Sequence, residues 1–440
     1  MTEEKPLEIT SFNELEAEFE KMFLFADKGV LRLLIATIIG NQLDNDPIWL
    51  MVIASSSGGK SELINAMDMI QIGEHDLIFP ISDLTTNTFA SGMKRTGKET
   101  SLLHRMPIGG ILTFKDFTSM LSKGREERTA IMGQMREIYD QKYTKETGTG
   151  DQIKWEGKIG VIAASTEVIY QFLEELSAMG DRFVMYSMKQ PEALEVTRFV
   201  MKYKKDGRSK ETDRKHLQTA TKSYTEYILD NMEEERAELS DETSEDIMIV
   251  ADFCTKARSG IIMNERKGHI DFIPSREMPV RMMEQLLAVA KSFIVMRRTE
   301  PMGQLTKNQK TEQASNNLSP AEREIIYKIA FDSIPIKRRI ALREMAKYAG
   351  GVKTAGLAAH IGYPTEPVQE WLQQLAGLGI CYREARVSGG TVWHMHHKYR
   401  TIMMKFEKLE AMDGVLEVGQ EEEADDFEVE SAWGDADFDS

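Results

Sequence analysis

Apolar and polar positions along the first 190 residues follow a pattern typical of an α/β sheet. Periodic apolar positions predict helices over residues 12–25 and 30–43. Further along, short apolar runs separated by helix-like segments predict strands joined by crossover helices. The expected strands cover residues 48–53, 77–81, 110–114, 158–163 and 183–186. The pattern therefore predicts a parallel sheet flanked by helices.

The pattern changes beyond residue 190. The next segment loses strand character and favours helices, among them expected helices over 213–239 and 278–296. A polar, aperiodic stretch follows and is typical of a linker. A compact unit with helix and strand signals comes next, and the chain ends in an acidic tail. The expected regions are residues 1–190, 191–298, 299–317, 318–406 and 407–440.

A loop of small residues follows the first expected strand. Residues 54–61 read Ala-Ser-Ser-Ser-Gly-Gly-Lys-Ser, and an amphipathic helix comes after them. A strand, such a loop and a helix are typical of a phosphate-binding loop, although Ala54 replaces the first glycine of the pattern. Backbone N–H groups and the helix start would bind the anion. Lys60 would reach the outer phosphates and Ser61 would hold Mg²⁺; the alternative is a chance Gly-Lys-Ser turn.

Polar side chains at other segment ends could complete such a site. Asp116 follows an apolar strand, where an acid can hold Mg²⁺ or orient a water molecule. Thr166 ends the next buried strand, and a hydroxyl there can position the same water. Arg182 stands on a tight turn and Arg281 opens a helix, and an arginine placed against a phosphate would stabilise transition-state charge. The alternatives are a simple strand-end acid, a surface ion pair and an ordinary helix start.

This order of segments resembles AAA+ ATPases over residues 30–298, and among them the minichromosome-maintenance and related viral-type helicases. The segments that carry the resemblance are Gly-Gly-Ile-Leu-Thr-Phe-Lys-Asp-Phe-Thr-Ser-Met (109–120), Arg-Thr-Ala-Ile (128–131) and Gly-Asp-Arg-Phe (180–183). It implies an α/β P-loop AAA+ module with a helical lid over 191–298. It also implies ATP and Mg²⁺ as cofactors.

The resemblance assigns roles by position. Cofactor binding falls to Ser57, Gly58, Gly59, Lys60, Ser61 and Glu62. Ser61 and Asp116 would hold Mg²⁺, with Asp116 as the Walker B acid. Thr166 would be sensor 1, Arg182 the arginine finger that acts on a neighbouring subunit, and Arg281 sensor 2. A homo-oligomer, with a hexamer favoured, is implied in the same way.

The end of the Walker B strand departs from the family pattern. Those helicases carry Asp-Glu there, whereas this chain carries Lys115 and Asp116. One carboxylate is therefore missing, and Lys115 could compete with Mg²⁺ for phosphate. Asp116 could perform both tasks, another acid such as Asp83 could help, or hydrolysis could be slow. The sequence predicts ATP binding and leaves turnover open.

A glycine-centred hairpin is expected over residues 141–155. Lys142, Lys145 and Lys154 supply positive charge, and aromatic residues stand near them. Lysines and aromatics that line a channel suit binding of single-stranded DNA without sequence preference. The alternative is a surface hairpin with ordinary lysines.

The compact C-terminal unit resembles a winged helix. A short helix, a turn and a second helix precede two strand-like runs, and such domains usually contact DNA through the second helix and the wing. Glu366 and Glu370 on the expected second helix would repel phosphates, whereas Arg383 and Arg386 on the wing could hold the DNA backbone. A basic cluster at residues 337–339 adds to them. DNA contact and a structural or protein-binding role both stay open.

Charge and composition narrow the classes of function. The net charge is −16 at pH 7, and residues 417–440 hold eleven acidic residues and no Lys or Arg. The rest of the chain is only mildly acidic and lacks a global basic signature. The acidic tail is expected to be disordered and could dock on a basic protein partner. No signal peptide or membrane span is expected, and two distant cysteines suit a reducing cytoplasm.

These features support three hypotheses of function. The first is an ATP-dependent, ring-forming DNA helicase, translocase or helicase loader in the DNA replication of a bacterium, phage or mobile element. The second is an ATP-switched DNA-binding regulator that does not unwind. The third is an ATP-dependent protein-assembly factor.

Overall fold

The computed structural model describes most of the chain up to residue 412. The described residues are 7–56, 58–89, 94–95, 98–99, 101–146, 152–172, 182–206, 208–233, 238–263, 270–301, 307–385 and 391–412. The acidic tail beyond them lies outside this set, as do two of the candidate site residues, Ser57 and Arg386. Within the described residues, no helix combines the length and the apolar character that a membrane crossing requires.

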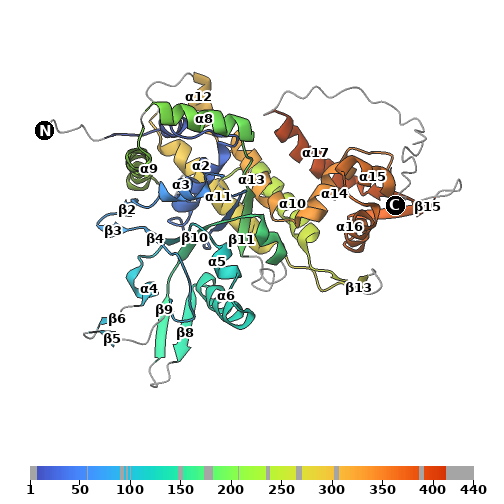
Figure 1. The fold of residues 1–440 in the computed structure, drawn as a ribbon, viewed down its shortest axis with the longest axis horizontal. Helices are drawn as coiled ribbons and strands as arrows, with labels where there is room; N and C mark the ends of the chain where they lie inside the picture. Colours follow the sequence, from blue (N-terminus) through green and yellow to red (C-terminus); the bar gives the residue numbers. More distant parts are fainter. Residues whose placement is uncertain are drawn as a thin grey trace, which may run out of the picture.

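A five-stranded parallel sheet forms the centre of the molecule (Figure 1), in the order β11-β1-β10-β7-β4. Its strands are β1 (Trp49–Ile53), β4 (Ile78–Pro80), β7 (Gly110–Phe114), β10 (Ile159–Ser165) and β11 (Phe183–Ser187). Every residue of β1, β7 and β10 is buried, which explains their nearly continuous apolar runs. The expected parallel sheet is therefore confirmed, with strand ends shifted by a residue or two.

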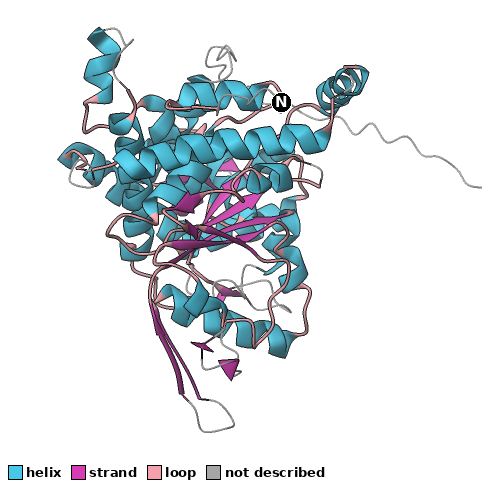
Figure 2. Ribbon diagram, turned by 90° about the vertical axis from the view of Figure 1, so that its left-hand side faces the viewer, coloured by secondary structure: helices cyan, strands magenta, loops and turns pink. Residues whose placement is uncertain are grey.

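Helices cover both faces of the sheet (Figure 2). Leu50 and Val52 of β1 join one hydrophobic core, whereas Trp49, Met51 and Ile53 join another, because successive side chains point to opposite faces. The helices of the first core are α2 (Gly29–Gly40), α3 (Lys60–Asn65), α9 (Lys210–Asn231), α10 (Asp241–Arg258), α11 (Val280–Thr299) and α13 (Pro320–Asp332). Those of the second core are α4 (Leu102–Arg105), α5 (Thr118–Leu121) and α6 (Arg125–Tyr139).

Further strands and helices lie outside the five-stranded sheet. The strands are β2 (Gln71–Ile72), β3 (His75–Asp76), β5 (Lys94–Arg95), β6 (Lys98–Glu99), β8 (Lys142–Glu146), β9 (Gln152–Glu156), β12 (Ile262–Met263) and β13 (Ile270–Phe272). The helices are α8 (Ala193–Lys205), α12 (Lys307–Gln313) and the 3-10 helix η1 (Glu167–Phe172). The antiparallel pair β12–β13 shows that the helical region also contains strands, which the sequence did not predict.

The N-terminal helix is shorter than its apolar pattern suggests. Helix α1 (Phe12–Glu20) begins at Ser11, whose side chain and that of Glu14 form a capping box. The helix was expected to reach residue 25, but the chain leaves the helix and packs Phe23 and Phe25 against Phe19. Those two rings also stack on each other at 5.6 Å. The packing of these three aromatic rings therefore accompanies the early end of the helix.

Two further expectations differ from the structure. The helix expected over 213–239 ends at Asn231, and Ser240 caps the separate helix α10 by accepting from the backbone N–H of Thr243. Part of the expected linker forms α12, and Gln313 at its end donates to backbone carbonyls at the end of α11. The polar sequence of this segment thus reflects hydrogen bonding to the body of the molecule.

The C-terminal elements combine helices with a small antiparallel sheet. They are α14 (Ile336–Ala346), β14 (Val352–Lys353), α15 (Thr354–Ile361), α16 (Thr365–Gly377), β15 (Cys381–Ala385), β16 (Thr391–Met395) and α17 (His397–Met412). The sheet order is β14-β16-β15. These elements share the first hydrophobic core with the main sheet, so α13 and α14 form a packed junction with the body.

Candidate nucleotide site

The loop after β1 has the backbone that a phosphate cradle needs. Gly59 has a φ of 81°, a left-handed conformation that favours glycine, and a Cβ atom there would lie 2.9 Å from the ring of Phe23. Ala54 has no such positive φ, is 4% exposed and donates its N–H to the carbonyl of Ser165 at 3.2 Å. Alanine in place of the first glycine is therefore compatible with the loop.

Lys60 folds back over this loop. Its Nζ donates to the carbonyls of Ala54 and Ser55, both at 2.6 Å, and the residue is 9% exposed. Burial lowers the pKa of Lys60, while the nearby carboxylates of Asp116 and Glu167 favour its charged form. The ammonium group thus lies in the mouth of the loop, where it can exchange loop carbonyls for phosphate oxygens.

The other candidate residues of α3 differ in their surroundings. Ser61 is exposed at the start of the helix, so its hydroxyl is available to a ligand. Glu62 instead accepts two hydrogen bonds from Arg214 of α9, at 2.9 and 2.7 Å, and this pairing lowers the pKa of Glu62. Glu62 therefore links α3 to α9, and its carboxylate is engaged by Arg214.

Two more candidate residues reach the same edge of the sheet. Asp116 is exposed after β7, and its Oδ1 accepts from the backbone N–H of Thr118 at 2.9 Å. Thr166 is half-buried after β10. Because β10 lies between β1 and β7, the carboxyl ends of the three strands carry Lys60, Thr166 and Asp116 side by side.

Lys115 has an ion-pair partner outside the phosphate loop. Its Nζ donates to Asp68 at 3.0 Å, at the end of the segment that follows α3. Burial raises the pKa of Asp68, against the effect of Lys115. Asp83, the sequence-based alternative for a second acid, pairs with Lys123 at 3.1 Å. Both side chains are thus engaged with other partners.

A pocket of about 170 Å³ adjoins Gly58 and Gly59. Its apolar lining comes from the loop after α1, from α3, from the segment after β11 and from α8. The residues are Met22, Phe23, Leu24, Phe25, Leu63, Met188, Pro191, Val196, Phe199 and Val200. An apolar slot with polar groups at one end suits a flat heteroaromatic ring such as a nucleotide base. Sequence reasoning missed it because its walls lie more than 160 residues apart in the chain.

The candidate arginines lie at the opposite edge of the sheet. Arg182 precedes β11, whose first residue pairs with Trp49 at the start of β1. The loop follows the other end of β1, roughly 13 Å away at the rise of a strand. Arg182 is 5% exposed, and its Nη2 donates to both carboxylate oxygens of Asp140, each at 2.8 Å. Arg182 therefore cannot reach the candidate nucleotide site of its own chain.

Arg281 belongs to the same edge as Arg182. It pairs with Glu277 at 3.2 Å, and Arg258 pairs with the same carboxylate at 3.0 Å. One turn after Arg281, Gln285 donates to the carbonyl of Arg182 at 2.6 Å. The structure thus gathers three arginines at the edge remote from the phosphate loop.

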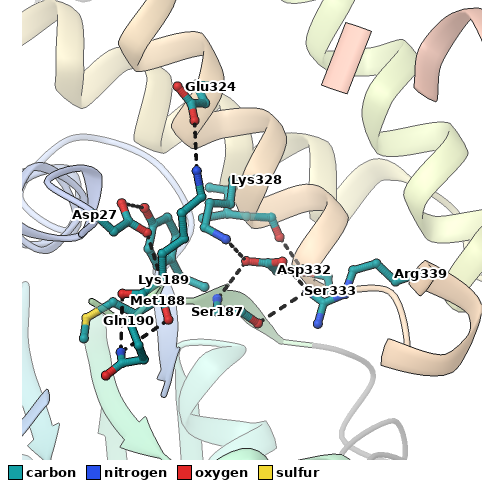
Figure 3. Close-up of polar contacts among 12 residues, drawn as sticks. Asp27, Ser187, Met188, Lys189, Gln190, Glu324, Lys328, Asp332, Ser333 and Arg339 are labelled. Carbon is teal, nitrogen blue, oxygen red and sulfur yellow. Dashed lines mark hydrogen bonds and ion pairs between the residues drawn. The ribbon is translucent and has the colours of Figure 1, made fainter. Parts of the chain in front are cut away.

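A polar bridge, made of Tyr170, Ser187, Asp332 and Arg339, joins the sheet to the C-terminal helices. Figure 3 shows Ser187, Asp332 and Arg339 of this bridge. Asp332 of α13 accepts from the N–H of Ser187 at 2.7 Å and from Lys328 at 2.9 Å, and it pairs with Arg339 of α14. Arg339 also donates to the hydroxyl of Tyr170 in η1 at 3.0 Å. Tyr170 lies just past the carboxyl end of β10, and Ser187 is the last residue of β11. The bridge therefore lies at the same edge of the sheet as the candidate nucleotide site.

The candidate DNA-binding lysines lie on the β8–β9 hairpin. Lys142 and Lys154 are exposed, but Lys145 donates to the carbonyl of Thr86 and to Asn87, at 3.0 and 3.1 Å. The aromatic residues of this hairpin pack on the core, since Tyr143 is 3% exposed and Trp155 is half-buried against the same cluster. The short hairpin β5–β6, with Lys94, Arg95 and Lys98, lies at the same end of the molecule (Figures 1 and 2) and was not singled out from the sequence.

The basic residues of the C-terminal unit are mostly engaged. Arg383 is exposed on β15 and donates to Thr391 at 3.3 and 3.2 Å. Arg338 is buried and donates to the last carbonyls of α10, Ala257 and Ser259, at 3.0 and 2.7 Å. Burial lowers the pKa of Arg338 to about 10. The expected basic cluster at 337–339 is therefore largely structural, because Arg339 belongs to the polar bridge.

No protein-family model and no curated protein sequence matches the chain. Several solved structures are similar. A full-length MCM homolog from Methanopyrus kandleri shares 13% identity with a TM-score of 0.44, over 73% of this chain and 59% of that one. The active helicase Cch of SCCmec type IV shares 11%, with a TM-score of 0.34, over 91% and 73%. NtrX from Brucella abortus, in complex with ATP, shares 14%, with a TM-score of 0.28, over 83% and 73%.

The parallel sheet, the glycine loop after β1 and the flanking helices form the α/β architecture expected for a P-loop AAA+ module. The chain spans 59% of the length of the MCM homolog. Because all three TM-scores are below 0.5, these likenesses carry no argument, and the function is inferred from the residues themselves.

Proposed function

We propose that this protein is an ATPase that binds ATP with Mg²⁺ in the loop at residues 54–61 and acts on DNA as a homo-oligomeric ring. The observation that supports ATP binding most strongly is the position of Lys60, in the mouth of a glycine loop and beside the apolar pocket. In this proposal the base enters the pocket and Lys60 binds the outer phosphates. Ser61 and Asp116 are the residues that would hold Mg²⁺, which would neutralise phosphate charge.

The test of this site is nucleotide binding by the full chain. Lys60→Ala should weaken ATP binding strongly, while Lys123→Ala, which removes a lysine from a surface ion pair, should leave it unchanged. Titration calorimetry with ATP and Mg²⁺ measures both Kd values. Equal affinity of the Lys60→Ala and wild-type proteins would disprove the site.

The arginine edge supports assembly of several copies. Arg182 and Arg281 lie too far from their own loop, so in a ring they would face the nucleotide of a neighbouring subunit. For Arg182 this requires release from Asp140. Native mass measurement with and without nucleotide tests assembly, and a chain that stays monomeric with ATP and DNA would refute the ring. A hexamer is the expected ring size.

The proposed DNA-processing role is supported by the exposed lysines Lys142 and Lys154 of the β8–β9 hairpin and by a C-terminal unit that we interpret as a winged helix. Lys142 and Lys154 would contact a DNA strand inside the ring, and Arg383 on β15 would contact DNA at the winged helix. Strand displacement with ATP distinguishes a helicase or translocase from a loader in replication. The tail would serve a protein partner.

The second candidate is an ATP-switched DNA-binding regulator that does not unwind. It is favoured by the engagement of Lys145, Arg338 and Arg339 with other parts of the chain, which leaves little free positive charge. ATP-dependent DNA binding without strand displacement would support this role. An ATP-dependent protein-assembly factor would bind no DNA at all.

A further inference from the structure

The carboxyl edge of β7 supplies a single carboxylate to the nucleotide site. Asp116 is exposed there, whereas its neighbour Lys115 pairs with Asp68. Phosphoryl transfer to water commonly uses one acid near Mg²⁺ and a second group that orients the attacking water. The second group must therefore come from another strand.

Strand β10 brings such a group between the other two strands. Its last residue, Ser165, accepts from the N–H of Ala54, and Ala164 accepts from the N–H of Phe117 at 2.7 Å. A side chain just after β10 thus emerges between the phosphate loop and Asp116. Glu167 is the first carboxylate in this position.

Glu167 is available for chemistry. It is exposed, it makes no hydrogen bond or ion pair with any side chain among the described residues, and its charge acts on Lys60 together with that of Asp116. It also opens η1, whose Ile169 is fully buried. The side chain of Glu167 is therefore available to a ligand, while the buried Ile169 holds the backbone of its helical turn in place.

The far end of η1 is clamped by the polar bridge. The hydroxyl of Tyr170 lies 2.8 Å from Oγ of Ser187 and accepts from Arg339 at 3.0 Å. Arg339 is itself held by Asp332, as Figure 3 shows. The turn that carries Glu167 is thus tied to helices α13 and α14, far away in the sequence.

We propose that Glu167 is the carboxylate that activates water in this ATPase and that Tyr170, held by Arg339, positions it. The inference rests on the proposed ATPase function. Glu167 accepts a proton as the water oxygen bonds to the γ-phosphorus, and the bond from that phosphorus to the β–γ bridging oxygen breaks. ADP leaves with the electron pair of that bond, and the proton passes on to the phosphate product or solvent. Asp116 remains for the metal.

The decisive variant is Glu167→Gln, which keeps the shape and cannot accept the proton. We expect an ATP Kd within about twofold of wild type and hydrolysis slowed by about 100-fold or more, the usual contribution of a general base. Glu167→Asp should retain part of the rate. Nucleotide recovered from the Gln variant after incubation should be ATP, whereas wild type should hold ADP. Glu127→Gln, an exposed carboxylate on α6, is the matched control.

Several results would overturn the inference. If the Glu167→Gln protein hydrolyses ATP at the wild-type rate, the inference is refuted. If Asp83→Asn abolishes hydrolysis while Glu167→Gln leaves it unaffected, the inference is also refuted. A wild-type protein that binds ATP and never hydrolyses it also refutes the role of Glu167 but leaves the binding site intact. If Lys60→Ala binds ATP like wild type, the proposed function itself fails.

The positioning role has its own test. Tyr170→Phe removes only the hydroxyl that the bridge holds, and kcat should fall on the order of tenfold at unchanged KM for ATP. Tyr399→Phe is the matched control, because its hydroxyl accepts from Lys256 at 2.8 Å at a different part of the C-terminal junction. Equal kcat values for the two variants would refute positioning by Tyr170.

Discussion

Asp332→Ala is a substitution for which the structure predicts a large loss of stability. Asp332 is 4% exposed, pairs with Arg339 and Lys328, and accepts the N–H of Ser187. Its removal leaves the Arg339 guanidinium, 8% exposed, with only neutral hydroxyl partners. Breaking one side of a buried ion pair costs about 3–5 kcal/mol. The unsatisfied N–H of Ser187 acts in the same direction.

Thermal unfolding measures this loss. The entropy of unfolding is about 2.1 cal/mol/K per residue, so 1 kcal/mol shifts Tm by about 1 °C in a chain of 440 residues, and a drop of roughly 3–5 °C is expected. Glu127→Ala removes an exposed ion-pair partner and should change stability by less than about 1 kcal/mol.

The double variant Asp332→Ala with Arg339→Met tests the cause. Replacing both members of a buried pair with apolar groups is often close to neutral, so the double variant should recover much of the lost Tm. A single Asp332→Ala variant within about 1 kcal/mol of wild type would refute the reasoning. A double variant no more stable than the single one would show that the unpaired charge is not the cause.

Three further predictions address other parts of the molecule. Burial raises the pKa of Glu300 above its ordinary value of 4.5, so the folded state holds this proton more tightly and loses stability as the pH rises through that range. In urea titrations, Glu300→Gln should therefore be more stable than wild type at pH 7 and equally stable near pH 4. Arg182→Ala and Lys60→Ala proteins, each poorly active alone, should regain ATPase activity when mixed, because a mixed ring joins an intact loop to an intact arginine; no gain would argue against action between subunits. Lys142→Glu with Lys154→Glu should weaken binding of fluorescent single-stranded DNA and reduce its salt dependence, and an unchanged affinity would contradict the hairpin's role.

The strands and the phosphate loop could be predicted because their signals are local. A strand buried on both faces needs consecutive apolar residues, and β1, β7 and β10 show them. The signal for the loop is equally local, since Gly59 and Lys60, the residues expected to bind one anion, are neighbours in the chain. The end of α1 was less predictable, because the packing of Phe23 and Phe25 replaces a helical turn that the apolar period alone would continue.

The partners of the charged side chains could not be predicted in this way. Lys115 and Asp68 are 47 residues apart, Arg182 and Asp140 are 42 apart, and Arg339 and Tyr170 are 169 apart. No periodicity in the sequence encodes such a pairing. A basic run at 337–339 has the same sequence pattern whether it faces solvent or, as with Arg338, the carbonyls of another helix.

The sequence by itself determined the class of fold and the position of the phosphate loop, because both depend on residues that are adjacent or regularly spaced. Only the tertiary structure decided which charges surround that loop. In the folded chain Lys115 pairs with Asp68, and Glu167 follows the strand between those of the loop and Asp116. Arg182 lies at the opposite edge of the sheet from the loop and Asp116. The physical reason is that a side chain's charge acts through space, and the order of strands in the sheet sets which side chains come within reach.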